Sequence, residues 1–592
     1  MKTPGNLLRI ILAASILFPV ISCYKKNEQP NVIIVLTDDQ GYGDLGVYGN
    51  PFLKTPNLDK LHEESIRFTD FHVVPMCAPT RGQLMTGVDC MRNGCMATCM
   101  GRATVREELP MMSEVFQEAG YRTGLFGKWH MGYNWPHRPM DRGFEEAIYH
   151  QGYGLTGMGH HWNSDYYDPF YYDKGELKQA EGWYCDDFWF SEAMKWMEKC
   201  NEKDEPFFCY LPTNMPHFPF WIDTTYSKPY EGSGAAEFYG LIAKFDENMG
   251  KLVQFLDKNK LTKNTILIFM SDNGSVKTGV YNAGMTGGKC RRTEGGHRVP
   301  FFIRWPNGNL VEPQDISTPT QVQDLFPTLI DLCNLETPEN AAFNGVSLQP
   351  LLKGQSFPDR MFVVQYHQND YQKYDAAIVW NQWRLMPRWG DQLYDVGKDI
   401  AQENNVAEAH PEIVRKMKDF YEDWWAEVEP VINDLVPNHI GSDNQPEVTL
   451  YSSDWEDVRA DGNNGPRRAT ERAKKGEEFT GGTWNINVHK TGNYRVELRR
   501  YPREADAAIC AAVPEFKPRF GEPLPAGIPL EVTKVNLVTA NGAFESEVSE
   551  KDKSIVFNVD LTEGESELKA WFGNAKEPVV CGAYYAYVSL NE

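Results

Sequence analysis

Residues 31–39 read NVIIVLTDD, an apolar and β-branched run that ends in two aspartates. A run this short and this continuously apolar predicts a strand buried on both faces, as in the centre of a parallel sheet. Three further runs have the same character: Arg122–Gly127, Pro206–Leu211 and Thr265–Ser271. Between the last two, residues Ala235–Leu261 carry apolar side chains at helical spacing. The alternation predicts an α/β fold, with a large, mixed but mostly parallel sheet flanked by helices.

Polar or ionisable residues follow each of these four runs. They are Asp38 and Asp39, Lys128 and His130, Asn214 and His217, and Asp272 and Asn273. In open α/β sheets ligands bind beyond the carboxyl ends of the strands, so we expect these residues to share one site. The alternative is that they only form turns and cap the following helices. Four endings rich in Asp, Lys and His favour a functional site.

The residues that follow two of these strands carry only oxygen atoms as potential metal ligands. Asp38, Asp39, Asp272 and Asn273 offer only carboxylate and amide oxygens, which select Ca²⁺ or Mg²⁺ over zinc or copper. Three carboxylates packed together without a cation would repel one another. The sequence therefore predicts a hard divalent cation at this place.

A second segment, Val74–Gly87, reads VPMCAPTRGQLMTG. Residues 77–81 fit the C-x-P-x-R signature of the type I, formylglycine-dependent sulfatases, a family of the alkaline phosphatase superfamily, and residues 84–87 continue its pattern. The chain resembles this family from about residue 31 to residue 429. The other family blocks stand in order at residues 37–44, 127–132, 216–219, 271–274, 287–289 and 294–300.

The resemblance implies that Cys77 is oxidised to formylglycine, which requires a formylglycine-generating enzyme as a maturation partner. One oxygen of the hydrated aldehyde would attack sulfur and the other would expel sulfate, which splits one difficult reaction into two. The ordinary alternative for Cys77 is a small buried hydrophobic residue. The implied reaction is hydrolysis of sulfate esters, with O-sulfate on a glycan or glycosaminoglycan-type saccharide as the substrate.

Residue roles follow from the same resemblance. One Ca²⁺ would be coordinated by Asp38, Asp39, Asp272, Asn273 and the modified Cys77. Lys128 and Lys289 would bind sulfate oxygens. Arg81 would hold the diol, His130 would take a proton from it, and His217 would protonate the departing sugar oxygen. A surface or core role is the alternative for any single Lys or His.

Two other functions are alternatives to a sulfatase. A phosphatase or phosphodiesterase of the same superfamily would use Thr or Ser with two zinc ions, and the Cys77 motif and the absence of a His-rich zinc set in the sequence argue against it. A catalytically inactive glycan-binding protein is disfavoured because every expected catalytic position is filled.

Aromatic residues and histidines crowd the stretch Met131–Asp173. It contains His137, His150, His160 and His161 among many tyrosines. Aromatic faces suit sugar rings, so the stretch is a candidate lining of the substrate pocket. The equal alternative is that these residues pack a loop-rich region.

The N-terminus has the layout of a secretory signal. Residues 1–22 form the predicted signal peptide, and the small Ser22 before Cys23 resembles a lipobox in which Cys23 is lipidated. An ordinary secretory signal is the alternative. Residues 24–30 would be a tether. We expect a protein exported from the bacterial cytoplasm, periplasmic or anchored at the cell envelope as a lipoprotein.

The remaining chain divides by pattern into four further parts. We expect a catalytic α/β domain at 31–345, a smaller antiparallel α+β subdomain at 346–437, a polar linker at 438–446 and a β-sandwich at 447–592. Short alternating segments such as Thr483–Val488 and Ser554–Leu561 predict the sandwich. This last domain either binds carbohydrate or buttresses the catalytic domain, and its lack of an obvious catalytic cluster favours buttressing.

The composition of the chain excludes some classes of binding partner and of protein scaffold. The 592 residues contain 59 basic against 82 acidic side chains, a net charge of −23, which argues against nucleic acid or anionic membranes as partners. The only membrane attachment expected is the lipid on Cys23. Twelve cysteines are too few for a disulfide scaffold. Cys90, Cys95 and Cys99 match no zinc spacing, which leaves buried thiols or one local disulfide.

Overall fold

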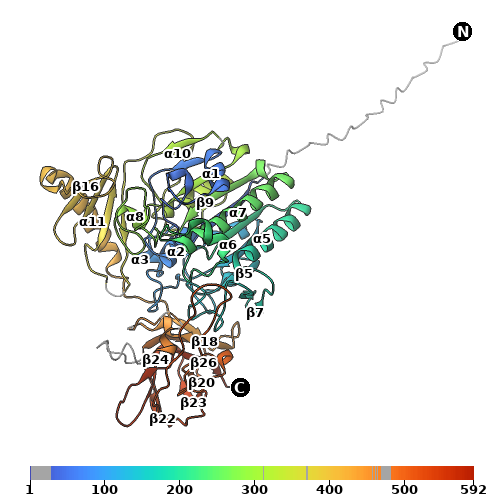
Figure 1. Ribbon diagram of the computed structural model, residues 1–592, viewed down its shortest axis with the longest axis vertical. Helices are drawn as coiled ribbons and strands as arrows, with labels where there is room; N and C mark the ends of the chain where they lie inside the picture. Colours follow the sequence, from blue (N-terminus) through green and yellow to red (C-terminus); the bar gives the residue numbers. More distant parts are fainter. Residues whose placement is uncertain are drawn as a thin grey trace.

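The computed structural model describes residue 1 and residues 29–310, 312–368, 371–456, 458–460, 462, 464–468 and 482–591. The predicted signal peptide beyond Met1, the lipobox with Cys23 and most of the tether lie outside the described residues. Within the described part of the chain, no helix is both long and apolar enough to cross a membrane. Figure 1 shows a large α/β part, a small subdomain beside it and a β-domain below.

A ten-stranded sheet forms the centre of the α/β part. Its strands are β1 (Asn31–Thr37), β2 (Ile66–Phe68), β4 (Arg122–Lys128), β5 (Glu146–His150), β6 (Phe170–Asp173), β7 (Glu176–Gln179), β8 (Phe207–Pro212), β9 (Thr265–Ser271), β10 (Phe301–Arg304) and β11 (Gln314–Ile316). Their order is β11-β2-β10-β9-β1-β8-β4-β5-β6-β7. The central strands β9, β1, β8, β4 and β5 are parallel, whereas β10, β6 and β7 are antiparallel to their neighbours. The predicted mixed, mostly parallel sheet is confirmed.

Helices cover both faces of this sheet. They are α1 (Pro56–Glu63), α2 (Cys77–Thr86), α3 (Cys90–Asn93), α4 (Met112–Glu118), α5 (Cys185–Glu202), α6 (Thr224–Ser227), α7 (Ala236–Lys258), α8 (Glu294–His297), α9 (Leu325–Cys333) and α10 (Gln349–Leu352). Helices α1, α5 and α7 pack on one face and α2, α4 and α9 on the other. A short strand pair, β3 (Phe71–His72) with β12 (Thr320–Gln321), lies outside the main sheet.

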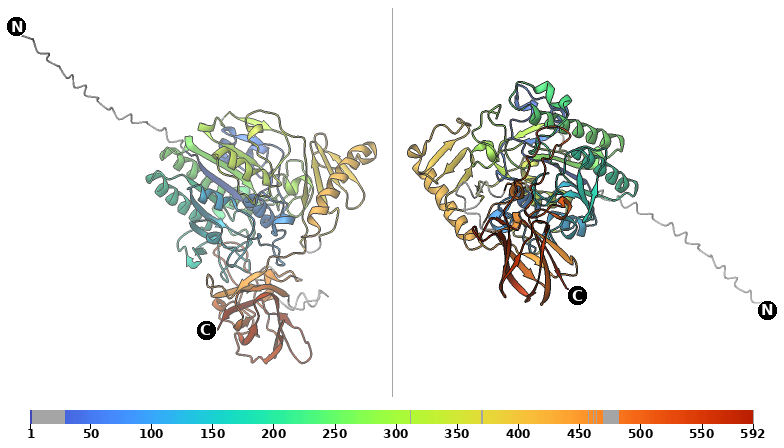
Figure 2. Two further views of the ribbon diagram at one scale, coloured as in Figure 1. Left: turned by 180° about the vertical axis from the view of Figure 1, so that it is seen from behind. Right: turned by 60° about the horizontal axis from the view of Figure 1, so that its bottom comes forward.

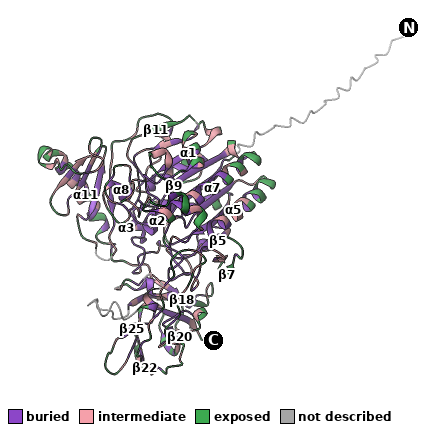
Figure 3. Ribbon diagram, viewed as in Figure 1, coloured by how far each residue is buried: buried purple, intermediate pink, exposed green. Residues whose placement is uncertain are grey.

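Strand β1 shows why its sequence is apolar throughout. Val32, Ile34 and Leu36 belong to the core under α2, α4 and α9, and Ile33 and Val35 belong to the core under α1, α5 and α7. All five are fully buried. Burying such a side chain contributes about 1.5–3 kcal/mol, so both faces of the strand stabilise the fold. In Figure 3 the central strands of the sheet are buried, and exposed residues gather on the outer sides of α5 and α7.

The small subdomain is an antiparallel sheet covered by one helix. Its strands β13 (Met361–Gln365), β14 (Ala376–Trp380), β15 (Trp383–Met386) and β16 (Gln392–Asp395) pair in chain order. Helix α11 (Pro411–Val428) packs on β13 and β14. Pro411 stands at the first helical position, where its missing N–H costs nothing. The predicted antiparallel subdomain is confirmed.

The C-terminal part is a sandwich of two sheets. One has the order β17-β19-β24-β21-β22 with β25 beside β24, and the other has the order β18-β26-β20-β23. The strands are β17 (Asn438–Ile440), β18 (Glu447–Tyr451), β19 (Thr483–Val488), β20 (Gly492–Arg499), β21 (Lys534–Thr539), β22 (Gly542–Glu547), β23 (Ile555–Leu561), β24 (Gly564–Gly573), β25 (Cys581–Gly582) and β26 (Tyr585–Leu590), and one short helix is α12 (Asn464–Arg467). Figures 1 and 2 show this β-domain projecting from one end of the molecule.

The predicted linker at 438–446 is wrong in its first half. Residues 438–440 form β17, which pairs in parallel with β19, and Ser442 bridges to Gln445. The sequence looks like a linker because its side chains are polar. They find partners across the β-domain instead of water, as where His439 Nδ1 lies 2.7 Å from His489 Nε2. The β-domain therefore includes residue 438.

The cysteine alternatives are resolved in favour of thiols. Cys90, Cys95 and Cys99 are buried, and no cysteine in the described part of the chain forms a disulfide. Cys95 donates to the carbonyl oxygen of Ala78 at 3.2 Å, which gives one thiol a structural role.

Candidate active site

The ends of neighbouring strands bring the predicted acidic residues together. Asp38 and Asp39 follow β1, and Asp272 and Asn273 follow β9, which pairs with β1 residue by residue. The backbone N–H of Asp39 donates to Asp272 Oδ1 at 3.1 Å. Asn273 Nδ2 donates to Asp39 Oδ1 at 2.9 Å. All four side chains are buried, as the strand-end argument predicts.

Helix α2 carries the next two site residues. Cys77 is its first residue, and Arg81 follows one turn later. All ten residues of the helix are buried. Arg81 donates through Nη2 to Asp272 Oδ2 at 2.8 Å and through Nη1 to the Lys128 carbonyl oxygen at 3.0 Å. A guanidinium buried this completely requires such partners.

Three cations face the three carboxylates. Lys128 Nζ lies 2.7 Å from Asp38 Oδ2, and Lys289 Nζ lies 2.6 Å from Asp39 Oδ1. With Arg81 on Asp272, the six formal charges cancel. A divalent cation with an inorganic sulfate dianion would leave this balance unchanged, whereas a divalent cation with a sulfate monoester, which carries a single negative charge, would leave one positive charge.

The carboxylate pKa values reflect this crowding. Burial alone would raise the pKa of Asp39, but the Lys289 ammonium and His217 hold it well below its usual range. Burial, with Asp38 as the next cause, raises the pKa of Asp272 to about 6, although Arg81 opposes the shift. A cation bound beside Asp272 would favour its ionised form.

The donor set fits a hard divalent cation. Asp38 Oδ1 and Asn273 Oδ1 are buried and have no hydrogen-bond partner among the described residues. Asp38, Cys77 and Asp272 each offer a ligand atom, and these atoms lie within 4.8 Å of one another. Buried oxygens without partners carry a desolvation penalty that a metal ion would remove. Asp38, Asp39, Asp272, Asn273 and the residue at position 77 would hold it.

His130 is arranged as a base toward Cys77. Its Nε2 lies 3.3 Å from the Thr98 carbonyl oxygen, and its Nδ1 lies 3.5 Å from Cys77 Sγ. Because a carbonyl only accepts, the Nε2 carries the proton and Nδ1 presents its lone pair to position 77. Burial, reinforced by Lys128, lowers the pKa of His130 well below its usual value. The ring is therefore neutral and able to accept a proton.

His217 has the opposite tautomer. Its Nδ1 lies 2.5 Å from the Phe218 carbonyl oxygen and must donate to it. The Nε2 lies 3.6 Å from Asp39 Oδ2. Burial lowers the pKa of His217 to about 3, although the Asp39 carboxylate opposes the shift. His217 becomes an acid only when a nearby negative charge stabilises its second proton.

The loop that carries His217 is held by residues that the sequence did not reveal. Asp186, on the first turn of α5, accepts from the backbone N–H groups of Asn214 at 3.0 Å and Met215 at 3.4 Å. The Tyr166 hydroxyl donates to the His217 carbonyl oxygen at 2.9 Å. Tyr166 stands in the aromatic stretch, but no sequence signal marks Asp186, since an acidic residue in a first helical turn is commonplace.

The aromatic and histidine stretch is largely buried. His137, His150 and His160 are buried, as the site residues are, and His161 stacks on Phe170, so a role of these histidines in lining the substrate pocket stays a prediction. Tyr153 is different, because it lies beside the site. Its ring centroid is 6.3 Å from that of His130 and 5.8 Å from that of His217.

Comparison with known proteins agrees with this geometry. The sulfatase family profile matches residues 30–335, and a profile described as N-sulphoglucosamine sulphohydrolase, C-terminal, matches residues 290–424. The chain is 30% identical over 381 residues to N-acetylgalactosamine-6-sulfatase of Rattus norvegicus, which covers 58% of this chain and 70% of that protein. It is 28% identical to N-acetylgalactosamine-6-O-sulfatase of Bacteroides thetaiotaomicron, with coverage of 67% and 93%.

A solved structure shares the architecture as well. The crystal structure of Ps i-CgsB in complex with k-i-k-neocarrahexaose superposes with a TM-score of 0.61 at 28% identity, over 67% of this chain and 92% of that one. The family profile alone covers more than half of the chain. This protein therefore belongs to the sulfatase family of the alkaline phosphatase superfamily, and it is a sulfatase.

Proposed function

We propose that the protein hydrolyses an O-sulfate ester of a glycan or glycosaminoglycan-type saccharide, with Cys77 converted to formylglycine and one Ca²⁺ bound. The observation that carries the proposal is the buried Cys77, which faces the lone pair of a neutral His130 within a ring of carboxylates and cations. Relatives named as N-acetylgalactosamine-6-sulfatases, and a related structure in complex with k-i-k-neocarrahexaose, support a sulfated sugar as the substrate class.

The side chains around position 77 would supply a base, positive charge for the sulfate group and a donor that holds the nucleophile in place. The hydrated aldehyde of formylglycine would supply a nucleophilic hydroxyl, and bound Ca²⁺ would lower the proton affinity of that hydroxyl and neutralise sulfate charge. His130 Nδ1 accepts the proton. Lys128 and Lys289 present ammonium groups to sulfate oxygens. Arg81 would hold the diol, and its contacts to Asp272 and the Lys128 carbonyl oxygen fix the guanidinium in place.

His217 is proposed as the acid for the departing sugar oxygen. Its Nε2 points toward Asp39, on the side of the site where Lys289 is partly exposed. An anionic sulfate beside this nitrogen would raise its pKa from about 3 toward the range where it can donate. Sugar alcohols are poor leaving groups, so protonation of the departing oxygen matters for this substrate class.

Maturation and location complete the proposal. A formylglycine-generating enzyme must act on Cys77 before folding closes around it, because the residue is only 1% exposed in the folded chain. The signal sequence and Cys23 support export from a bacterial cytoplasm, with the protein periplasmic or lipid-anchored at the cell envelope.

The test combines mass spectrometry with activity. The enzyme is produced with a formylglycine-generating enzyme, and the tryptic peptide of residues 68–81 is examined for the aldehyde. Turnover is measured on 4-nitrophenyl sulfate and on a panel of desalted sulfated mono- and disaccharides. We expect conversion of Cys77, sulfate release from at least one saccharide, and complete loss of both in Cys77→Ala.

Cys581→Ala is the matched control, since it removes a buried thiol of β25 in the β-domain. It should keep the modification and the activity. A wholly unmodified Cys77 in an enzyme that releases no sulfate from any probe would overturn the proposed function.

A further inference from the structure

The loop that follows β8 leaves one large apolar side chain in solvent. Of residues 207–222, all of which the structure describes, Phe218 alone is exposed, with 54% of its surface accessible. The residue before it, His217, is buried. Single exposed apolar side chains are common on protein surfaces and by themselves indicate nothing. What sets Phe218 apart is its place directly after the candidate acid.

Hydrogen bonds on both sides of Phe218 fix the backbone of this loop. The Phe218 carbonyl oxygen accepts from His217 Nδ1 at 2.5 Å, and the His217 carbonyl oxygen accepts from the Tyr166 hydroxyl at 2.9 Å. Further along, Trp221 is buried, and its indole N–H donates to the Glu522 carbonyl oxygen at 2.9 Å. Phe218 therefore projects into solvent from a backbone that is held in place relative to His217.

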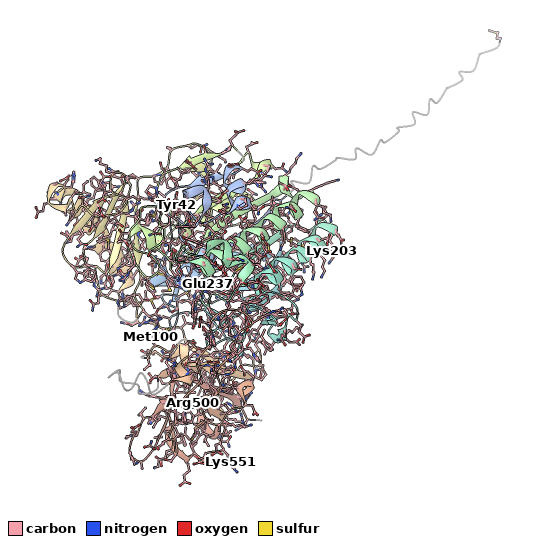
Figure 4. All side chains as sticks on the ribbon, in the orientation of Figure 1. Tyr42, Met100, Lys203, Glu237, Arg500 and Lys551 are labelled. Atoms are coloured by element: carbon pink, nitrogen blue, oxygen red, sulfur yellow. The ribbon has the colours of Figure 1, made fainter. Side chains whose placement is uncertain are left out.

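A second aromatic side chain supports the ring of Phe218. The Phe218 and Phe220 rings meet edge to face, with centroids 5.7 Å apart and planes at 88°. Phe220 in turn packs on Phe238 of α7, and Lys277 Nζ lies 5.0 Å from the centroid of the Phe220 ring. Figure 4 labels Glu237, the residue before Phe238, in the α/β part. The contact with Phe220 restricts the Phe218 ring without covering it.

The exposed fractions of the three cations show where the site meets solvent. The side chains of Lys128 and Arg81 are fully buried, whereas 17% of the Lys289 side chain is exposed. Lys289 shares Asp39 with His217, whose Nε2 lies 3.6 Å from Asp39 Oδ2. The opening of the site is therefore on the side where Lys289 and the candidate acid lie.

A short segment that begins at Ser275 connects this opening to the two phenylalanines. The Ser275 carbonyl oxygen accepts from the backbone N–H of Lys289 at 3.1 Å. Two residues further on, Lys277 lies over the ring that supports Phe218. Between them, Val276 is 38% exposed. Phe218 and Val276 therefore both border the opening as exposed apolar side chains.

The opposite side of the candidate acid is occupied by Tyr153. The centroid of the Tyr153 ring lies 6.3 Å from that of the His130 ring and 5.8 Å from that of the His217 ring. The far end of this side chain meets the β-domain, where a Cβ placed on Gly462 would lie 2.7 Å from the Tyr153 hydroxyl. A sugar whose oxygen takes a proton from His217 therefore extends toward the opening and not toward His130.

We propose that Phe218 binds the ring of the leaving-group sugar, a role that rests on the proposed function. A departing oxygen that accepts from His217 Nε2 lies about 3 Å from that nitrogen, and the pyranose that carries this oxygen extends into the opening beside Phe218. The C–H faces of a pyranose are apolar and pack on an aromatic ring. Phe218 thereby favours a sugar sulfate over a sulfate ester whose alcohol has no ring.

The test measures the effect of this aromatic ring on KM and on kcat. Matured enzyme is assayed on the sulfated mono- or disaccharide that it hydrolyses best. In Phe218→Ala, KM should rise about fivefold to tenfold, as expected for a lost ring contact, while kcat stays within about twofold of the wild type. Phe218→Tyr, which keeps the ring, should keep the wild-type KM.

Two controls belong to this experiment. Leu177→Ala removes an exposed apolar side chain from the edge strand β7 and should leave both constants unchanged. The inhibition constant of inorganic sulfate, which occupies only the sulfate-binding part of the site, should be the same in Phe218→Ala and in the wild type. Thermal unfolding midpoints show whether each variant is folded.

The outcomes separate the sugar contact from the proposed function. If the wild type releases sulfate from no saccharide, the proposed function fails and the sugar contact falls with it. If the wild type is active but Phe218→Ala has the KM of Leu177→Ala, or Phe218→Tyr shares the rise of Phe218→Ala, the sugar contact is overturned while the sulfatase activity stands. A loss of kcat at unchanged KM, or a weaker inhibition by sulfate that parallels KM, would also overturn it, because Phe218 would then act on the His217 loop or on the sulfate pocket.

Discussion

At the scale of single residues, two carbonyl oxygens decide what the two histidines can do. The Thr98 oxygen takes the Nε2 proton of His130, and the Phe218 oxygen takes the Nδ1 proton of His217. His130 therefore presents Nδ1 to Cys77, and His217 presents Nε2 to Asp39. In the proposed mechanism the same residue type serves as base and as acid, because each ring is held by a different backbone partner.

Asp186 is predicted to matter through His217. Replacing it with Ala removes the acceptor for two backbone N–H groups of the His217 loop, at a cost of about 1–2 kcal/mol. Turnover of a sugar or alkyl sulfate should fall about tenfold more than turnover of 4-nitrophenyl sulfate, because a good leaving group needs little protonation. Steady-state kinetics on both substrates check this.

Two variants control the Asp186 experiment. Burial raises the pKa of Asp186 to about 7, so Asp186→Asn, which keeps one acceptor oxygen, should remain near wild type. Asp187→Ala alters the next residue, which pairs with Lys244 instead of the loop, and should not change the leaving-group dependence. Equal losses on both substrates in Asp186→Ala would show that the residue only supports the fold.

Among single residues, the sequence predicted those whose type is chemically unusual at its position. Acidic residues after buried strands and Cys77 in its motif are such cases. Tyr153 and Asp186 were not distinguished, because a tyrosine among many and an acid in a helix start look ordinary. Their importance depends on neighbours, such as Gly462 and Asn214, that are remote in the sequence.

At the scale of elements, the site depends on how closely β4 and β8 end together. Gly127 has φ +134°, and a Cβ there would lie 1.9 Å from the carbonyl oxygen of Pro212. Only glycine allows this approach. The next residue is Lys128, so the spacing of two strand ends sets the position of a sulfate-binding candidate.

Gly127→Ala should therefore separate the two strand ends. We expect kcat/KM to fall at least about a hundredfold and the free energy of unfolding to fall by about 2–4 kcal/mol, since backbone must move. Gly120→Ala is the matched control, because Gly120 also has positive φ but has no atom within 4 Å of an added Cβ. It should cost about 1 kcal/mol and keep the activity. Similar activity losses in both variants would contradict the close-approach argument.

Elements were predicted well where the chain shows a continuous or a regularly alternating apolar pattern, and poorly where a short segment is mostly polar. Buried strands such as β1 and β9 have continuous apolar runs, so their bounds agree with the sequence. Strand β17 has only one apolar residue, Ile440, and was taken for a linker. Helix α2 is buried on every side, so it has no amphipathic pattern and only its motif marked it.

At the scale of the whole molecule, a negative body carries a locally positive site. The net charge is −23, whereas Lys128, Lys289 and Arg81 converge on one place. Long-range repulsion acts on a polyanionic chain as it approaches, and short-range attraction acts on the bound sulfate. Salt weakens the long-range repulsion more than the short-range attraction, because exposed charges are screened beyond about 8 Å at physiological ionic strength.

The value of kcat/KM on a highly sulfated polymer should therefore rise from low salt up to physiological ionic strength. A monosulfated monosaccharide is the control, and its dependence should be weaker because it carries a single charge. Initial rates at several sodium chloride concentrations check both. A profile for the polymer that falls from the lowest salt upward would show that attraction at the site dominates the encounter.

The sequence by itself determined the class of the molecule: a mostly parallel sheet, an oxygen ligand set at its strand ends and a cysteine motif for sulfatase chemistry. These features are local in the chain, since each needs only a short run of residues. The tertiary structure alone decided the tautomers of His130 and His217, the support of the His217 loop by Asp186, and the approach of the β-domain to Tyr153. Each of these depends on contacts between distant segments, and local pattern does not encode which distant backbone oxygen or glycine a side chain will meet.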